Sequence, residues 1–234
     1  MTRLHIPDGW VDPAFLIITW IITISVLFLS LRKMRDLDET RITYMAVLGG
    51  TIFAAQMLNF PIVGGTSGHL LGGALAASIV GPWGGILVIS VVLLIQALVF
   101  ADGGIVALGV NIFNMGIVGV IVGYLVIRYL MLGVEPESHK IRYYGGVFLG
   151  AFLSVVISSL FAAIEIGIPI INYPATIPFT VALPAILFYH VLIGIGEGLI
   201  TMFIVRYFNI IEMNVFLELE HPTFNISTFR RYEK

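Results

Sequence analysis

Cysteine is absent from this chain of 234 residues, and charged residues make up only 11% of it. The lack of cysteine excludes a disulfide framework, a thiolate metal site and thiol catalysis. Because 59% of the residues are hydrophobic, polar side chains are too few to cover a soluble globule of this length. No basic stripe with interleaved aromatic residues is present, which argues against a nucleic-acid partner. The composition indicates an integral membrane protein.

Long, continuous apolar runs predict an all-α bundle of about seven transmembrane helices, because a β-barrel would alternate apolar and polar residues in shorter segments. The predicted spans are residues 14–31, 42–60, 69–80, 85–101, 105–130, 143–166 and 178–206. The third is too short to cross about 30 Å of hydrocarbon at about 1.5 Å per residue. It is expected to be tilted, buried in protein, or extended through neighbouring glycines.

Lysine and arginine set the predicted orientation. They gather after the first span, between the fifth and sixth spans, and beside or after the seventh. These residues are Arg32, Lys33, Arg35, Arg41, Arg128, Lys140, Arg142, Arg206, Arg230, Arg231 and Lys234. With seven spans these regions share one face, which the positive-inside rule makes cytoplasmic. The amino terminus is then outside and the carboxyl terminus cytoplasmic.

Two histidines at the predicted outer face are candidate metal ligands, because imidazole binds borderline divalent metals such as nickel and cobalt. His5 precedes a Pro-Asp-Gly turn that can fold the amino-terminal segment back onto the bundle. His69 is expected to begin the third span, where the positive helix end favours neutral imidazole. Each could instead be structural, His5 as a solvated side chain and His69 as a capping or packing residue.

Several polar residues are candidates to orient these ligands or to gate the site. Asp8 or Asp12 could accept a hydrogen bond from the ring nitrogen of His5 that does not bind metal. The others are Asn59, Thr66 and Asn114, provided that their helix ends converge.

Five motifs, taken together and in this order, resemble those of one protein family. They are His-Ile-Pro-Asp-Gly at residues 5–9, Gly-Thr-Ser-Gly-His-Leu-Leu-Gly-Gly at 65–73, Phe-Ala-Asp-Gly-Gly at 100–104, Asn-Ile-Phe-Asn-Met at 111–115 and Gly-Ile-Gly-Glu-Gly at 194–198. On these motifs the chain resembles the membrane substrate-binding component of energy-coupling-factor cobalt/nickel importers, up to about residue 206.

The resemblance implies a transporter component rather than an enzyme, with nickel(II) or cobalt(II) as substrate and no organic cofactor. Its implied partners are a transmembrane coupling subunit, cytoplasmic ATPase subunits and, in some cases, a small accessory membrane subunit, in the plasma (inner) membrane of a prokaryote. Imported cobalt would feed cobalamin synthesis. In agreement, the sequence has no Gly-x-x-x-x-Gly-Lys-Ser/Thr phosphate loop. The chain divides into an outer metal-binding segment (1–13), a transmembrane domain (14–207) and a short cytoplasmic tail (208–234).

The resemblance also implies a square-planar nitrogen site. Its donors are the terminal amine, the amide nitrogen and imidazole of a histidine at position two, and the histidine of the Gly-His-Leu-Leu motif. Here His5 is fifth, so the terminal amine is displaced. Translation from a near-cognate codon at Leu4, or trimming to Leu4, would restore it, which makes Leu4 a predicted ligand beside His5 and His69.

Two rival functions rest on His190. A rhomboid-like serine protease would pair it with Ser67, but Ser67 lies at the outer edge and His190 about 18 Å along the seventh span. A proton-coupled metal carrier would use His190 and Glu197, which share one helical face. Alternatively, these two residues make structural polar contacts with Asn111, Asn114 or Gln96, as Glu165 could also do. The pairs Gly119/Gly123 and Gly146/Gly150 are expected to serve close helix packing.

Overall fold

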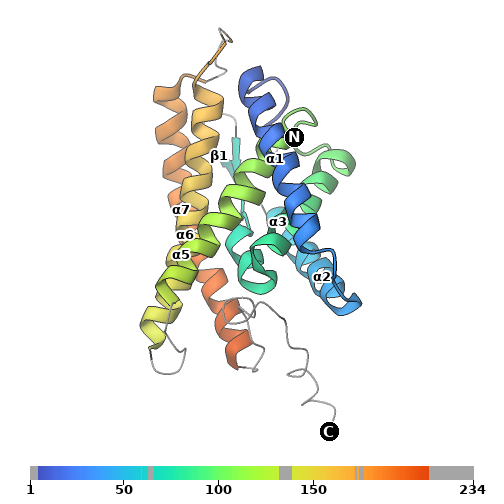
Figure 1. Ribbon diagram of the computed structural model, residues 1–234. Coiled ribbons are helices and arrows are strands. Elements are labelled where there is room, and N and C mark those ends of the chain that lie inside the picture. Colours follow the sequence, from blue (N-terminus) through green and yellow to red (C-terminus); the bar gives the residue numbers. More distant parts are fainter. Residues whose placement is uncertain are drawn as a thin grey trace.

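The computed structural model describes residues 5–58, 60–62, 66–131, 139–171, 173 and 177–210. They form a helical bundle with one small β-hairpin (Figure 1). The elements are α1 (Pro13–Lys33), α2 (Glu39–Gln56), β1 (Phe60–Ile62), β2 (Thr66–Gly68), α3 (Gly73–Val99), α4 (Leu108–Asn111), the π-helix η1 (Ile112–Val118), α5 (Gly119–Met131), α6 (Lys140–Gly167) and α7 (Phe179–Ile210).

Five helical stretches are long and apolar enough to cross a membrane: α1, α3, the continuous stretch Leu108–Met131, α6 and α7. This confirms the prediction of a multi-pass, helical membrane protein. The predicted span 42–60 is too long, since α2 ends at Gln56 and Phe60–Ile62 pairs antiparallel with Thr66–Gly68. The physical reason is local, because Pro61 has no N–H to extend a helix.

The element labelled α3 reverses direction at Gly81, whose φ of 74° and ψ of 172° are not helical. A Cβ added at Gly85 would lie 3.0 Å from the amide nitrogen of Ala77. Along a straight helix these two positions would be about 12 Å apart. Residues 73–80 and 82–99 are therefore two antiparallel arms. The short arm is almost wholly buried, so burial in protein is the arrangement observed for the predicted run 69–80.

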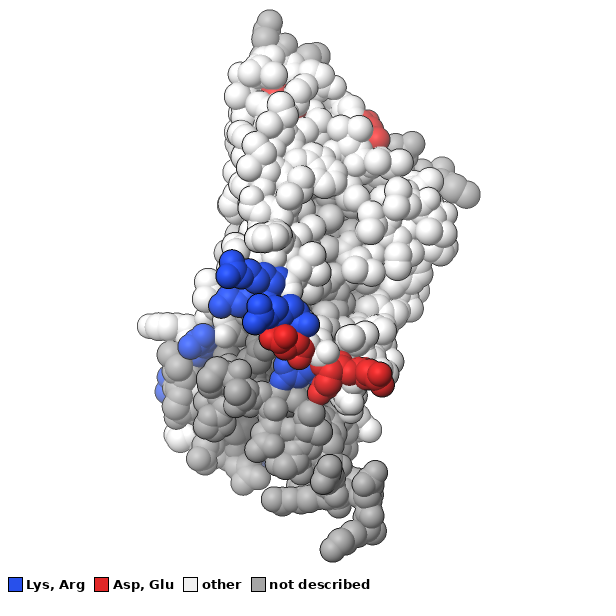
Figure 2. Space-filling model, turned by 45° about the vertical axis from the view of Figure 1, so that its right-hand side comes forward, with Lys and Arg blue, Asp and Glu red and all other residues white. Residues whose placement is uncertain are grey.

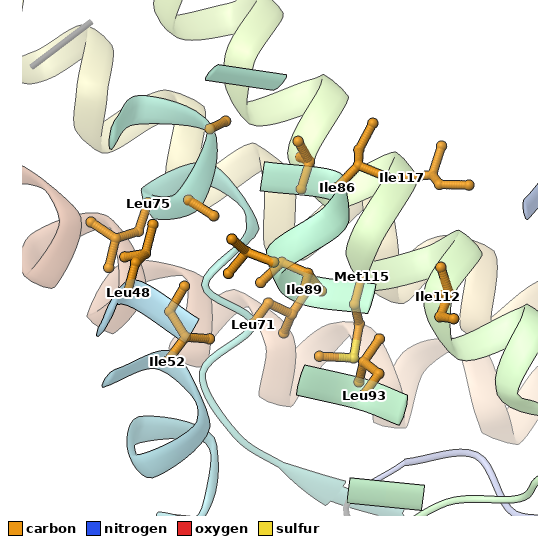
Figure 3. Packing of buried hydrophobic residues seen from close by; sticks show 14 of the residues in the cluster. Leu48, Ile52, Leu71, Leu75, Ile86, Ile89, Leu93, Ile112, Met115 and Ile117 are labelled. Atoms are coloured by element: carbon orange, nitrogen blue, oxygen red, sulfur yellow. The ribbon is translucent and has the colours of Figure 1, made fainter. Parts of the chain in front are cut away.

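The long arm of α3 carries the centre of the apolar core. Figure 3 shows Ile86, Ile89 and Leu93 close to Ile52 of α2 and Met115 of η1. Each of these side chains is at most 7% exposed. α3 also packs against α1, α5 and α6, so it is the element around which the other helices are arranged.

Glycines allow the helices on the other side of the short arm to approach closely. A Cβ at Gly123 would lie 2.6 Å from the Cβ of Ala74, and one at Gly150 would overlap the side chain of Ile127. A Cβ at Gly146 would lie 3.1 Å from a side-chain carbon of the same helix pair. The predicted role of the glycine pairs in close packing is confirmed.

Charge is distributed unevenly along the bundle. The Lys and Arg side chains visible in Figure 2 gather toward its lower end. In Figure 1 the α1–α2 junction and the junction between α5 and α6 lie at this end, whereas α1 begins at the other. The described basic residues in these regions include Arg32, Lys33, Arg128 and Arg142.

We predict that Gly85→Ala lowers stability by about 1–3 kcal/mol, because the added methyl group meets the backbone of the opposite arm. Gly50→Ala is the matched control. Nothing lies within 4 Å of its added Cβ, so it should be neutral or stabilise by about 0.5–1 kcal/mol. Thermal unfolding of the detergent-solubilised protein compares the two. Equal midpoints would contradict the hairpin.

Candidate metal centre

The amino-terminal segment is held against the end of α4 by paired hydrogen bonds. The side chain of Asn111 accepts from the Ile6 N–H and donates to the Ile6 C=O, both at 3.1 Å. The N–H of Gly104 also donates to the Ile6 C=O at 3.0 Å. Asn111 thus pairs with both backbone polar groups of Ile6, as the backbone of a neighbouring β-strand would. These bonds also hold His5, the residue before Ile6, with its side chain buried in the bundle.

The turn predicted at Asp8 and Gly9 is present, with Gly9 at a φ of 86°. The Asp8 carboxylate accepts from the N–H groups of Ile105, at 3.1 Å, and Ala107, at 2.9 Å. Gly104 contacts Asp8 so closely that a Cβ there would overlap it. Asp8 therefore ties the segment to the loop before α4.

Asp12 fixes the other end of the segment. It caps α1 through the Ala14 N–H, at 2.8 Å, and accepts from Ile170 and Ile171, at 2.7 and 2.9 Å. Burial raises the pKa of Asp12, but these backbone donors outweigh burial and lower it below its usual value. An ionised Asp12 joins the start of α1 to the loop after α6.

The structure brings His5 and His69 together. Their ring centroids are 4.8 Å apart, the ring planes are nearly perpendicular at 89°, and each residue is 6% exposed. His69 does not begin a helix, because α3 starts at Gly73. The prediction that a helix end favours neutral imidazole at His69 is therefore wrong. The residue lies in an extended connection between β2 and α3.

Glu197 of α7 holds this connection. Its two carboxylate oxygens accept from the N–H groups of Leu71, at 2.7 Å, and Gly72, at 2.9 Å. Gly72 has a φ of 78°, which glycine adopts without strain. Glu197 thus makes a structural polar contact, as one of the two predicted alternatives has it, but its observed partners are backbone N–H groups rather than asparagine or glutamine side chains. Glu197 fixes the backbone that follows His69.

Two glutamines determine which nitrogen of His5 carries its proton. The amide nitrogen of Gln56 donates to the Leu71 C=O at 2.8 Å, and a carbonyl can only accept. The Gln56 oxygen therefore accepts from the amide nitrogen of Gln96, at 2.9 Å. The Gln96 oxygen is left to accept from Nε2 of His5, also at 2.9 Å. The direction of these bonds places the His5 proton on Nε2.

The bond to Gln96 leaves the lone pair of the neutral His5 ring on Nδ1. Nδ1 of His5 is buried and has no hydrogen-bond partner among the described residues. Burial, followed by the proximity of His69, lowers the pKa of His5 to about 3 although the bond to Gln96 raises it. Nδ1 of His69 lies 2.9 Å from the Leu70 C=O and donates to it, so in the neutral ring Nε2 is the nitrogen without a proton. Neutral imidazole nitrogens of this kind are metal ligands.

The partner of the His5 imidazole is therefore Gln96, not Asp8 or Asp12. Sequence reasoning did not assign Gln56 and Gln96 to the site. The sequence did hold a signal, because an amide side chain within an apolar run is costly in a membrane unless it has a partner. Both glutamine side chains are fully buried in the structure.

The remaining predicted residues are only partly described. Leu4 and Asn59 lie outside the described residues, and Thr66 lies in β2 with its side chain outside them. The same holds for the side chain of Ser67, so the Ser67–His190 pair has no described geometry. Asn114 is buried and donates to Glu165.

A cavity of about 60 Å³ opens beside the two histidines. Its lining includes His5, His69, Asn114, Ser158 and His190. The expectation that His190 lies far from the histidine pair is therefore wrong, and its Nδ1 donates to a backbone carbonyl of its own helix. Within the described ranges no three His, Cys, Asp or Glu side chains form a metal-binding group by themselves. A metal here needs further donors.

We predict that Gln96→Leu removes the bias of His5 toward the Nε2–H form. Nitrogen-15 NMR of histidine-labelled, metal-free protein measures the two ring nitrogens directly. Affinity for divalent nickel should fall about tenfold, the equivalent of one lost hydrogen bond. Ser90→Ala removes another buried polar group of α3, whose hydroxyl donates to Ile86, and should change neither readout. An unchanged His5 tautomer in Gln96→Leu would contradict this account.

Comparison with known proteins agrees with the geometry. Residues 5–215 match the family model described as cobalt uptake substrate-specific transmembrane region. A putative fused nickel transport protein of Archaeoglobus fulgidus is 42% identical over 204 residues, which are 87% of this chain and 65% of that protein. A putative metal transport protein of Methanocaldococcus jannaschii is 32% identical over 228 residues, 96% of this chain and all of that protein.

This chain spans less than two thirds of the length of the fused Archaeoglobus relative. Solved structures of a transition metal transporter and of a truncated transition metal transporter superpose with TM-scores of 0.81 and 0.78. Both are 32% identical and cover 90% of this chain, with 95% and 100% of their own chains matched. The resemblance inferred from the five motifs is confirmed, and the chain belongs to the CbiM family of cobalt uptake substrate-specific transmembrane proteins.

Proposed function

We propose that this protein captures nickel(II) or cobalt(II) at the outer face of the membrane as the substrate-binding component of an ATP-driven importer. The observation that carries the proposal is the meeting of His5 and His69 as buried imidazoles with ring centroids 4.8 Å apart. Two buried imidazoles this close together suit a borderline divalent metal. Relatives named as nickel and cobalt transport proteins support the substrate class.

In this proposal His5 binds the metal through Nδ1 and His69 through Nε2. A chain that starts at Leu4 adds the terminal amine and the His5 amide nitrogen, which completes a square-planar nitrogen set. That geometry favours nickel(II), and cobalt(II) is accepted by the same donors. Asp8 supports the site by anchoring the segment, as its bonds to Ile105 and Ala107 indicate.

The proposed topology has seven membrane helices, with the amino terminus outside and residues 208–234 as a cytoplasmic tail. The reversal at Gly81 supports counting the two arms of α3 separately. The gathering of basic side chains at the end away from the start of α1 supports the orientation (Figure 2). Residues 1–13 form the outer metal-binding segment and 14–207 the transmembrane domain.

ATP hydrolysis and coupling are assigned to partners: a transmembrane coupling subunit, ATPase subunits and an optional accessory membrane subunit. The missing phosphate loop supports this division of labour. Release requires that the site be dismantled. Withdrawal of the amino-terminal segment would break its bonds to Asn111 and the bonds at Asp8 and Asp12. Cobalt delivered in this way would serve cobalamin synthesis.

We predict that His69→Ala and His5→Ala each weaken nickel and cobalt binding at least about tenfold, because each removes one imidazole donor. Isothermal titration of the purified protein measures the affinity, and metal uptake in cells that contain the partner subunits measures transport. His139→Ala is the control, since His139 is an exposed residue that precedes α6 at the other end of the bundle. Normal binding and uptake by both site variants would exclude this function.

The start of the mature chain gives a separate prediction. If Leu4 supplies the terminal amine, the intact mass of protein produced from its native start lacks residues 1–3. Electrospray mass spectrometry of the purified protein measures this mass. A mass that contains Met1, Thr2 and Arg3 would exclude the terminal amine as a ligand and leave the two imidazoles as donors.

A further inference from the structure

Asn114 lines the cavity beside the histidine pair and has a side-chain oxygen with no partner among the described residues. Its side chain is 4% exposed, and its amide nitrogen donates to the carboxylate of Glu165. Its Oδ1 has no hydrogen-bond partner in the described part of the chain. A buried amide oxygen is normally paired, so an unpaired one that lines a cavity indicates a missing ligand.

His190 lines the same cavity, and the orientation of its ring is fixed by a hydrogen bond. Its Nδ1 lies 2.7 Å from the C=O of Ile186, one turn earlier in α7. Because the carbonyl can only accept, Nδ1 carries the proton and Nε2 the lone pair. The tautomer of His190 is therefore fixed by its own helix.

The hydroxyl groups of the lining also present oxygen rather than hydrogen. Ser158 donates its proton to the Asn114 C=O at 2.8 Å, and Ser159 donates to the Val156 C=O at 2.8 Å. Together with the unpaired Nδ1 of His5 and Oδ1 of Asn114, these groups make a lining rich in acceptors. Such a cavity favours a cation over an anion or a neutral donor.

The backbone around Asn114 departs from regular α-helix. Asn114 lies in the π-helix η1, and its carbonyl accepts from the Gly119 N–H. Isolated π-helical turns occur frequently at functional sites. Asn111, about one turn earlier, anchors the segment that carries His5. One irregular stretch of helix thus serves the histidine pair and reaches past it toward α6 and α7.

We propose that Nε2 of His190 and Oδ1 of Asn114 form an inner station for the divalent metal, filled after the ion leaves His5 and His69. This inference rests on the proposed function. Water completes the coordination, and Glu165, which accepts from the Asn114 amide nitrogen, fixes the orientation of that amide. Two divalent ions in a cavity of about 60 Å³ repel each other, so the two stations are occupied in turn.

The test uses the full chain with both outer imidazoles removed, His5→Ala/His69→Ala, titrated with cobalt(II) chloride by calorimetry. We expect this background to retain one binding event, at least about tenfold weaker than in the unmodified protein. Adding His190→Asn should weaken that event at least about tenfold further. The asparagine amide can still donate to the Ile186 C=O but lacks a nitrogen at the position of Nε2.

Asn114→Leu in the same background is an independent variant with the same expected loss, and Ser90→Ala is the control that should change nothing. X-ray absorption of bound cobalt should show imidazole scattering in the background that His190→Asn removes. Cobalt binding that is absent from the background, or unchanged by both variants, would overturn the inner station. Failure of the proposed function gives a different result from failure of the inner station. In that case the unmodified protein would bind cobalt no more tightly than the His5→Ala/His69→Ala background does.

Discussion

The direction of one series of buried hydrogen bonds decides the chemistry of the site. The carbonyl of Leu71 can only accept, so the amides of Gln56 and Gln96 are both oriented and the proton of His5 is held on Nε2. The carboxylate of Glu197 holds the N–H of the same Leu71. The backbone beside His69 and the ring of His5 are thus fixed by one network, in which each polar group constrains the next.

This arrangement explains why costly polar groups lie inside a bundle of apolar helices. Gln56, Gln96 and Glu197 are each at most 1% exposed, and burial without partners would destabilise the fold. Each is satisfied by a group at or near the histidine pair. The short arm of α3, which follows Gly72, brings that backbone into the bundle, and its glycine contacts leave room for α5.

The apolar runs predicted a multi-pass helical bundle but not every helix boundary, and the motifs predicted the meeting of His5 and His69. The orienting contacts were not predictable, because Gln96 is 91 residues from His5 and Glu197 is 126 residues from Leu71. Local pattern also misplaced the start of α3. Glu197 of α7 binds the backbone of the connection after His69. Helix-capping rules use only neighbouring residues, so they could not predict this long-range contact.

The most direct test of the account is the position of the metal in crystals of the protein grown with nickel, located by anomalous diffraction at the nickel edge. The account predicts one strong peak bonded to Nδ1 of His5 and Nε2 of His69, with Nε2 of His5 still against Gln96. A peak away from both rings, or bonded to Nε2 of His5, would contradict it.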